Sequence, residues 1–248
     1  MLMRKLRASG RLLVLLWHVL LGVWIVYMRF PQMDAALRRA TVERWQARLV
    51  ALCGIRLELH GAPALPPDGG GVLQISNHIS WLDISTLHGI RFCRFVSKSE
   101  VKDWPLVGRL ADAADTLYLQ RASRRDAHRM LEQVAGRLQA GDVITVFPEG
   151  TTSDGVDLLP FHANMFQAAI QADAPIQPIA IRFLDAQGQV SLAPCYINND
   201  SLWDTLWRTL QESGLVVSVR FGELQYAQGR SRQQWAEDVR TTVAQLRR

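Results

Sequence analysis

From position 71 the chain reads Gly71-Val72-Leu73-Gln74-Ile75-Ser76-Asn77-His78-Ile79-Ser80-Trp81-Leu82-Asp83-Ile84. Its first part, Val72–Ser76, is a short and mostly apolar run that predicts a β-strand. Its second part predicts a tight turn and then a short helix that ends near His88. A strand that passes through a turn into a helix is the repeating unit of α/β folds, so this stretch predicts that fold class.

Strand and helix patterns alternate along the rest of the chain. The other predicted strands are Ile55–His60, Phe92–Val96, Thr116–Leu119, Val143–Phe147, Ile176–Arg182 and Val216–Phe221. The other predicted helices are Asp34–Leu52, Trp104–Ala113, Arg124–Gln139, Phe161–Gln171, Leu202–Gln211 and Arg232–Leu246. Because Val143–Phe147 is nearly continuous in β-branched and aromatic residues, it predicts a sheet covered on both faces. We therefore expect a mixed, largely parallel sheet flanked by helices.

His78 and Asp83 lie five positions apart, which is about 1.4 turns of helix. A carboxylate this close can hydrogen-bond one imidazole nitrogen, which fixes the tautomer and leaves the other nitrogen able to accept a proton. The sequence contains no G-x-S-x-G motif and no obviously activated cysteine. The pair therefore favours a base that activates a hydroxyl group of a substrate. The alternative is an ordinary polar turn with Asn77 or Ser80 as the helix cap.

Two further polar loops follow predicted strands. Gln120-Arg121 comes after Thr116–Leu119, and Pro148–Ser153 comes after Val143–Phe147. Ligands of α/β sheets bind beyond the carboxyl ends of the strands, so we expect these loops to share one site with His78. Arg121 would supply a fixed cation for an anionic group, and the Pro148–Ser153 loop offers a carboxylate, hydroxyls and backbone N–H groups.

Charge and cysteine content narrow the function further. The 248-residue chain carries a net charge of +5, but its first 60 residues hold ten basic and only three acidic side chains. The body is therefore mildly acidic, which is not typical of a nucleic-acid-binding protein, whereas a basic and apolar N-terminus suits an anionic membrane surface. The three cysteines are widely spaced, so we expect no zinc site and a reducing compartment.

The N-terminal segment is apolar between basic flanks. From Leu12 to Met28 only His18 is polar, and a helix of that length nearly crosses the hydrocarbon core, which needs about 20 residues. A single transmembrane span, a membrane-embedded or re-entrant helix and a buried core helix all fit this pattern. A cleaved signal peptide fits less well, because the apolar stretch is long and no small-residue cleavage site follows it. Basic residues flank both ends, so the positive-inside rule assigns no orientation.

Two motifs resemble those of a known family. Asn77-His78-x-Ser80-x-x-Asp83 and Phe147-Pro148-Glu149-Gly150-Thr151-x-Ser153 are similar to the main motifs of the glycerolipid acyltransferases, which include the PlsC-type 1-acyl-sn-glycerol-3-phosphate acyltransferases and related lysophospholipid acyltransferases. Weaker similarity extends over Thr116–Arg121 and Ala174–Ile181. The two motifs stand in the family's order about 70 residues apart, and the resemblance covers roughly Ile55 to Ile181.

The resemblance implies an enzyme that moves a fatty acyl group from acyl-CoA or acyl carrier protein to the free hydroxyl of a lysolipid, without a metal or other cofactor. The first expected acceptor is 1-acyl-sn-glycerol-3-phosphate, which would give phosphatidic acid. His78 and Asp83 would be catalytic, with backbone N–H groups near Gly150 or the His78 turn as candidate donors to the oxyanion. The residues expected to bind substrate are Asn77, Ser80, Arg121, Glu149, Gly150, Thr151 and Ser153.

The resemblance also implies an organisation and a location. Residues 1–53 would be membrane-associated helices and residues 54–248 the acyltransferase domain, at the cytoplasmic face of a bacterial inner membrane.

One position departs from the family pattern. Thr152 stands where phosphatidic-acid-forming members usually have an arginine that helps to hold the acceptor phosphate. This leaves lyso-ornithine lipid, or another lysolipid, as an alternative acceptor. A hydrolase that activates water and a non-catalytic membrane-associated lipid-binding protein are alternatives from other classes.

Overall fold

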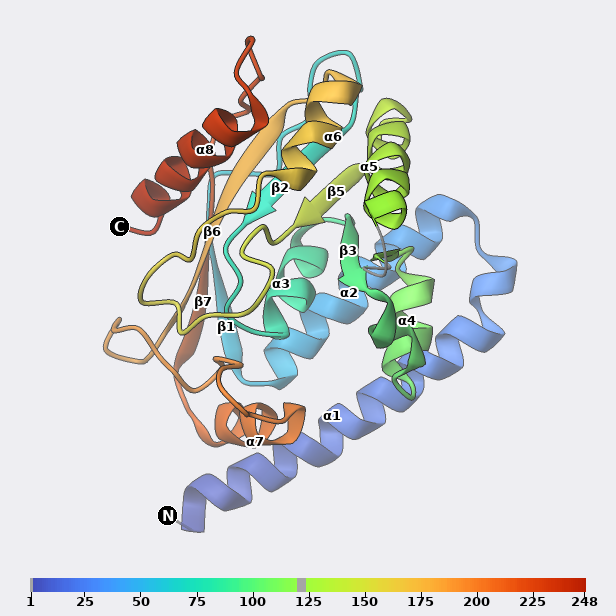
Figure 1. The fold of residues 1–248 in the computed structure, drawn as a ribbon. Helices are drawn as coiled ribbons and strands as arrows, with labels where there is room; N and C mark the ends of the chain where they lie inside the picture. The colour runs from blue at the N-terminus through green and yellow to red at the C-terminus, as the bar shows by residue number, and fades with distance from the viewer. Residues whose placement is uncertain (1, 120–123) are drawn as a thin grey trace.

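A computed structural model describes residues 2–119 and 124–248 and shows a sheet between two layers of helices (Figure 1). The strands in this part of the chain are β1 (Ile55–His60), β2 (Val72–Ser76), β3 (Arg94–Lys98), β4 (Leu117–Leu119), β5 (Val143–Val146), β6 (Ile176–Leu184) and β7 (Leu215–Phe221). The helices are α1 (Leu2–Met28), η1 (Phe30–Gln32), α2 (Ala35–Leu52), α3 (Leu82–Ile90), η2 (Ser99–Asp103), α4 (Val107–Ala113), α5 (Arg124–Gln139), α6 (Asn164–Ala172), α7 (Leu202–Gln211) and α8 (Arg232–Leu246).

The strands are ordered β1-β7-β6-β2-β5-β3-β4. Strand β2 lies at the centre and pairs in parallel with both β5 and β6, while β6 and β7 pair antiparallel. The remaining pairs, β1 with β7, β3 with β5 and β3 with β4, are parallel. The prediction of a mixed, largely parallel sheet flanked by helices is confirmed.

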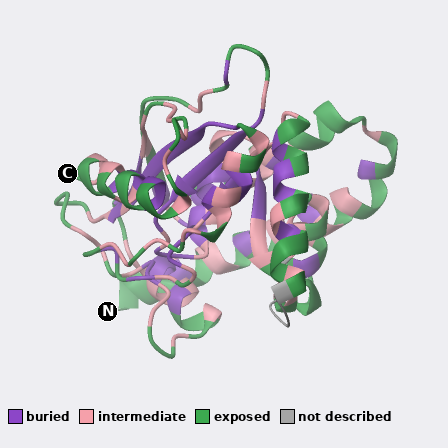
Figure 2. Ribbon diagram, turned by 45° about the horizontal axis from the view of Figure 1, so that its top comes forward, coloured by how far each residue is buried: buried purple, intermediate pink, exposed green. Residues whose placement is uncertain are grey.

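The two faces of the sheet bury different apolar clusters. Alternate residues of a strand point to opposite faces, and on β6 Ile179, Ile181 and Phe183 pack in the cluster that includes α1, α2, α3 and α7 residues. Ile176 and Ala180 pack instead with residues of α5, α6 and α8. Figure 2 shows the resulting pattern of buried strands beneath helices whose outer sides are exposed. Each face is therefore shielded from water, as the near-continuous apolar strands require.

Three elements begin two or three residues later than the sequence pattern predicts, and tertiary contacts explain two of these shifts. Strand β3 begins at Arg94 instead of Phe92, because the Phe92 N–H donates to Glu43 Oε1 of α2 at 2.7 Å. Helix α6 begins at Asn164 instead of Phe161, because the His162 N–H donates to the Pro148 carbonyl. Helix α4 begins at Val107, since Leu106 has a positive φ of 62° and so stands outside helical geometry.

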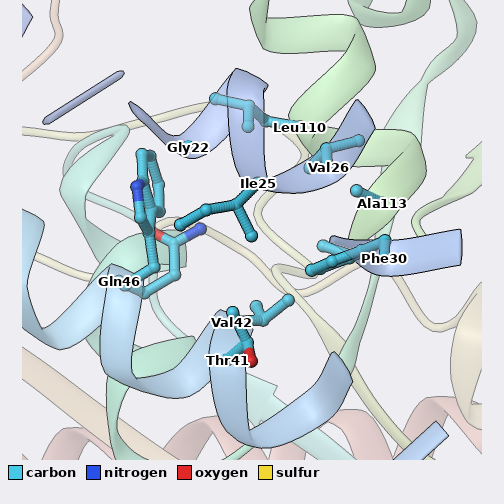
Figure 3. A pocket seen from close by; sticks show the side chains of 11 residues that line it. Gly22, Ile25, Val26, Phe30, Thr41, Val42, Gln46, Leu110 and Ala113 are labelled. Atoms are coloured by element: carbon cyan, nitrogen blue, oxygen red, sulfur yellow. The ribbon is translucent and has the colours of Figure 1, made fainter. Parts of the chain in front are cut away.

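The N-terminal helices pack on the same body. Ala8, Leu15 and Gly22, spaced by seven residues, form the buried stripe of α1. The Arg11 guanidinium donates to the carbonyls of Leu210 and Glu212 at the end of α7. Further along, α1, η1, α2 and α4 enclose a small apolar cavity of about 30 Å³ into which Ile25, Val42 and other labelled side chains point (Figure 3). The boundary at residues 53 and 54 stays a prediction, since these helices share a hydrophobic cluster with the body.

Buried His88 of α3 should make stability depend on pH. Its Nε2 is 2.7 Å from the Cys93 carbonyl oxygen, and burial lowers its pKa from 6.5 to about 4. Between these two values the unfolded chain binds the proton and the folded chain does not, so stability falls as pH drops from about 6.5 to 4. The loss is on the order of 3 kcal/mol over that window. Urea unfolding across this range should show a smaller loss of unfolding free energy for His88→Phe than for the wild type. The control His128→Gln removes an exposed histidine of α5 and should lose as much unfolding free energy as the wild type. An equal loss of unfolding free energy with falling pH in all three proteins would contradict the assignment to His88.

Candidate active site

Two loops meet at the carboxyl ends of the neighbouring strands β2 and β5. The backbone N–H of His78 donates to Glu149 Oε1 at 2.8 Å. The backbone N–H of Ser153 donates to the His78 carbonyl at 2.9 Å. The expectation that the His78 turn and the Pro148–Ser153 loop lie together at one sheet edge is therefore met by direct hydrogen bonds between them.

Asp83 organises the His78 turn through one carboxylate oxygen. Its Oδ2 lies 2.7 Å from His78 Nδ1 and accepts the N–H groups of Ile79 at 2.6 Å and Ser80 at 2.8 Å. Asp83 is fully buried in the first turn of α3, a position where the helix dipole also favours negative charge. The Nε2 of His78 makes no hydrogen bond within residues 2–119 and 124–248, and the side chain is 18% exposed. The imidazole is thus held by one nitrogen and open at the other.

Phe147 supports the imidazole from one face. Its ring stacks on His78 with centroids 4.0 Å apart and an interplanar angle of 9°. Phe147 in turn stacks on Phe95 of β3 at 5.6 Å. The site prediction omits Phe147 although it stands in the quoted motif. An aromatic residue at the end of a strand is typical of the hydrophobic core, so the sequence alone gives no signal that Phe147 contacts His78.

The Glu149 carboxylate links the His78 turn to the backbone of Leu159, ten residues further along its own loop. Its side chain is 4% exposed, and while Oε1 accepts the His78 N–H, Oε2 accepts the N–H of Leu159 at 3.1 Å. Burial raises the pKa of Glu149, and the two N–H groups partly offset that rise. Both carboxylate oxygens are thus engaged by backbone, which makes Glu149 a brace for the site.

Asn77 and Ser80 are buried with their polar atoms engaged. The Asn77 side chain donates to the Ile181 carbonyl at 3.0 Å and accepts the Ile181 N–H at 2.8 Å, so it continues the pairing of β2 with β6. Ser80 Oγ accepts the N–H of Leu82 at 3.3 Å. These contacts hold the turn in place, and they leave the Asn77 amide with its two ends occupied.

The residues after Glu149 form an irregular loop. Gly150 has φ of +70°, which favours glycine, and a Cβ there would lie 3.3 Å from the His162 ring. Thr151 is exposed, whereas Ser153 is buried with Oγ 3.3 Å from the His78 carbonyl oxygen. The Thr152 hydroxyl donates to the Tyr196 carbonyl. The sequence offers no local signal for this contact, because the Tyr196 loop joins β6 to α7.

Arg121, expected to hold the substrate head group, lies outside the described residues.

The sequence predicts that backbone N–H groups near Gly150 or in the His78 turn could donate to an oxyanion, but the structure leaves few of them available. The N–H groups of His78, Ile79 and Ser80 are all taken by the carboxylates of Glu149 and Asp83. The Gly150 N–H donates to the Phe147 carbonyl at 3.2 Å. The N–H groups of Thr151 and Thr152, directly after it, make no hydrogen bond within the described part of the chain.

The cysteines are poor nucleophiles. Cys53, Cys93 and Cys195 are free and buried. Burial raises the pKa of each of these thiols to about 12, so the reactive thiolate is scarce at neutral pH. A base at His78 would therefore act on a hydroxyl or a water that comes with the substrates.

Known proteins resemble this chain in sequence and fold. The model of the family described as Acyltransferase matches residues 56–182. The chain is 39% identical over 183 residues to the 1-acyl-sn-glycerol-3-phosphate acyltransferase of Neisseria meningitidis serogroup B, covering 74% of this chain and 70% of that protein. It is 34% identical over 245 residues to the lyso-ornithine lipid O-acyltransferase of Pseudomonas aeruginosa, covering 97% of this chain and 92% of that protein.

The fold comparison agrees. The crystal structure of the 1-acyl-sn-glycerophosphate (LPA) acyltransferase PlsC from Thermotoga maritima matches with a TM-score of 0.71 at 21% identity, over 99% of this chain and 95% of that one. At that identity the match speaks for the fold, while the family model and the two relatives speak for the chemistry. By its matching motifs, its relatives and its sheet, this chain belongs to the acyltransferase family and is an enzyme that transfers acyl groups.

Proposed function

We propose that this enzyme acylates the free hydroxyl of a lysolipid with His78 as general base. The observation that carries the proposal is the imidazole held at Nδ1 by buried Asp83 and free at Nε2. Nε2 accepts the hydroxyl proton as the hydroxyl oxygen attacks the thioester carbonyl of the acyl donor. When the tetrahedral intermediate collapses, the C–S bond breaks and the thiolate takes that proton from Nε2.

Asp83 has two parts in this mechanism. Its carboxylate keeps the proton of neutral His78 on Nδ1, and it stabilises the imidazolium while Nε2 holds the substrate proton. The oxyanion of the intermediate needs hydrogen-bond donors. We assign that part to the free N–H groups of Thr151 and Thr152, since those of the His78 turn already bind carboxylates. The cosubstrate is acyl-CoA or acyl carrier protein, and the proposed chemistry needs no metal or further cofactor.

The first proposed acceptor is 1-acyl-sn-glycerol-3-phosphate, which places the enzyme in phospholipid biosynthesis. The Neisseria relative bears that acceptor in its name. A second acceptor, lyso-ornithine lipid, is favoured by Thr152, whose hydroxyl is bound to the Tyr196 carbonyl and which supplies no cation. The Pseudomonas relative of that name also aligns along nearly the whole chain.

We propose that α1 lies in the membrane interface on the cytoplasmic face of a bacterial inner membrane. Helix α1 is long enough and apolar enough to cross a bilayer. Its buried stripe and its hydrogen bond to α7, however, hold it along the protein body (Figure 1). Its other sides expose large apolar residues, among them Leu13, Trp17, Leu20 and Trp24. A helix docked in this way can bury those side chains in one leaflet with the body held at the surface.

An acceptor assay tests the proposal. Purified full-length protein in mixed micelles is incubated with acyl-CoA and either lysophosphatidate or lyso-ornithine lipid, and both acylated lipid and free fatty acid are measured. We expect acylated lysophosphatidate. Acylation of lyso-ornithine lipid alone would replace the first acceptor with the second, and free fatty acid alone would indicate a hydrolase. Thr152→Arg should raise kcat/KM for lysophosphatidate by about tenfold through a charge-assisted bond to its phosphate, with Thr152→Val as the uncharged control.

A further inference from the structure

A second concave site borders the Glu149 loop and is strongly basic. Its volume is about 600 Å³, within the range of small-molecule pockets. The charged side chains that line it are Arg182, Arg240, Arg247, Arg248 and Asp157. The remaining lining residues are Gly155, Val156, Leu158, Val190 and Ala244. The lining thus holds four arginines and one carboxylate. Outside the lining, Arg240 pairs with Glu237 at 3.3 Å, and the charges of Glu149 and Asp154 also act on Arg247.

Two of the four arginines build the wall of the pocket. Arg247 donates to the carbonyls of Gly155 and Val156, and Arg240 donates to those of Leu158 and Leu159. These bonds tie the carboxyl-terminal part of α8 and its end to the loop that follows Glu149. Burial and the nearby charge of Arg182 lower the pKa of Arg247, although Glu149 and Asp157 act in the opposite direction. These two arginines have a structural explanation.

The other two arginines have no such explanation. Arg182 lies on β6, on the face of the sheet that α8 covers, because its neighbours Ile181 and Phe183 point to the other face. Neither the Arg182 nor the Arg248 side chain makes a hydrogen bond or ion pair within residues 2–119 and 124–248. Their guanidinium groups are therefore free to bind an anion in the cavity, in two parallel bonds to one phosphate for example.

The pocket is coupled to the catalytic turn by its wall. Gly155, in that wall, lies so close to Ile79 that a Cβ there would be 2.9 Å from the Ile79 side chain. Ile79 follows His78 directly, and the Ser153 N–H bonds the His78 carbonyl. A ligand in the basic pocket would thus lie against the same loop that braces the base.

We propose that this basic pocket binds a phosphate ester carried by a substrate of the transfer reaction, an inference that rests on the proposed function. A pocket of this volume with two unpaired arginines, Arg182 and Arg248, matches the phosphorylated nucleotide of an acyl-CoA, which carries several phosphates. The phosphate of a lysolipid is the other source of the same chemistry.

Equilibrium binding to the full-length protein in detergent tests the pocket without requiring turnover. The probes are CoA, 3′-dephospho-CoA and glycerol 3-phosphate. Removing both free cations in Arg182→Gln/Arg248→Gln should weaken CoA binding at least tenfold, and Arg248→Gln alone, at an exposed position, should weaken it by a smaller factor. Arg232→Gln, at the opposite end of α8, is the matched control and should bind CoA as the wild type does.

Kinetics identify the source of the phosphate. A raised KM for acyl-CoA with an unchanged KM for the acceptor assigns the pocket to the donor, and the reverse assigns it to the lysolipid. CoA and glycerol 3-phosphate binding that is unaffected in both variants, with both KM values unchanged, would overturn the proposal. If the pocket binds CoA in an Arg182-dependent way and no acyl transfer is found with any acceptor, the proposed function fails while the binding site stands.

Discussion

His78→Ala is expected to lower kcat for acyl transfer by about a thousandfold or more, with the fold intact. The variant removes the nitrogen that we propose as the acceptor of the hydroxyl proton, and a positioned general base contributes roughly 10²–10⁴-fold to such reactions. The His78 backbone N–H, which Glu149 binds, stays in place. The measurement is acylated lipid formed under saturating acyl-CoA and lysolipid, together with a thermal unfolding curve for each protein.

The matched control for this experiment is His128→Ala. His128 is exposed on α5, so its loss should leave kcat within about twofold of the wild type, as for most surface substitutions. A His78→Ala protein that is folded and keeps more than a tenth of wild-type kcat would refute the base assignment. If His78→Ala lost both its activity and its folded state, the missing stacking contact between the imidazole and the Phe147 ring would explain the result.

Asp83→Asn should cost nearly as much activity, about a hundredfold to ten-thousandfold in kcat. The amide keeps an oxygen for the N–H groups of Ile79 and Ser80, but it no longer supplies the charge that stabilises the His78 imidazolium. Because Nδ1 bonds the same Oδ2 position as these two N–H groups, the amide oxygen would also keep the contact with His78. The loss should fall on kcat with little change in KM, because Asp83 is buried and does not reach the substrate.

Comparison with Asp83→Ala separates catalysis from structure. Alanine leaves three donors that meet at Oδ2 without an acceptor, and each unsatisfied buried donor costs about 1–3 kcal/mol. Asp83→Ala should therefore unfold at clearly lower denaturant concentration, whereas Asp83→Asn should unfold near the wild-type midpoint. An Asn variant with wild-type kcat would reduce Asp83 to a structural cap of the turn before α3.

Local features of the site could be predicted because their partners are close in the chain. His78 and Asp83 are five residues apart, so the turn alone brings them within hydrogen-bonding reach. The apolar runs of β2 and β5 predict these two strands. Because they are parallel neighbours, the loops that follow them lie at the same edge of the sheet. Helix α8 is predicted to the residue, since it has a complete capping box at Ser231 and Gln234.

Contacts between distant segments could not be predicted in this way. The Asn77 side chain pairs with Ile181, 104 residues away, and so extends the pairing of β2 with β6. From the sequence, a polar residue in this loop suggests a contact with the substrate. Glu149 meets the His78 N–H across 71 residues, and its side chain reads as a free carboxylate until both oxygens are seen to be bound. Such pairings depend on strand order, and an apolar strand pattern specifies burial without specifying which strand lies alongside.

By itself the sequence identified this chain as an acyltransferase, and it placed a candidate base and a carboxylate that can orient it within a single turn. The tertiary structure alone decided what surrounds that pair: the Phe147 ring on the imidazole, the Glu149 brace and the contact of Thr152 with Tyr196. It also brought Arg182 of β6 beside the end of α8. The physical reason is that side-chain chemistry belongs to each residue, whereas the neighbours of a residue are set by how helices and strands pack over the whole chain.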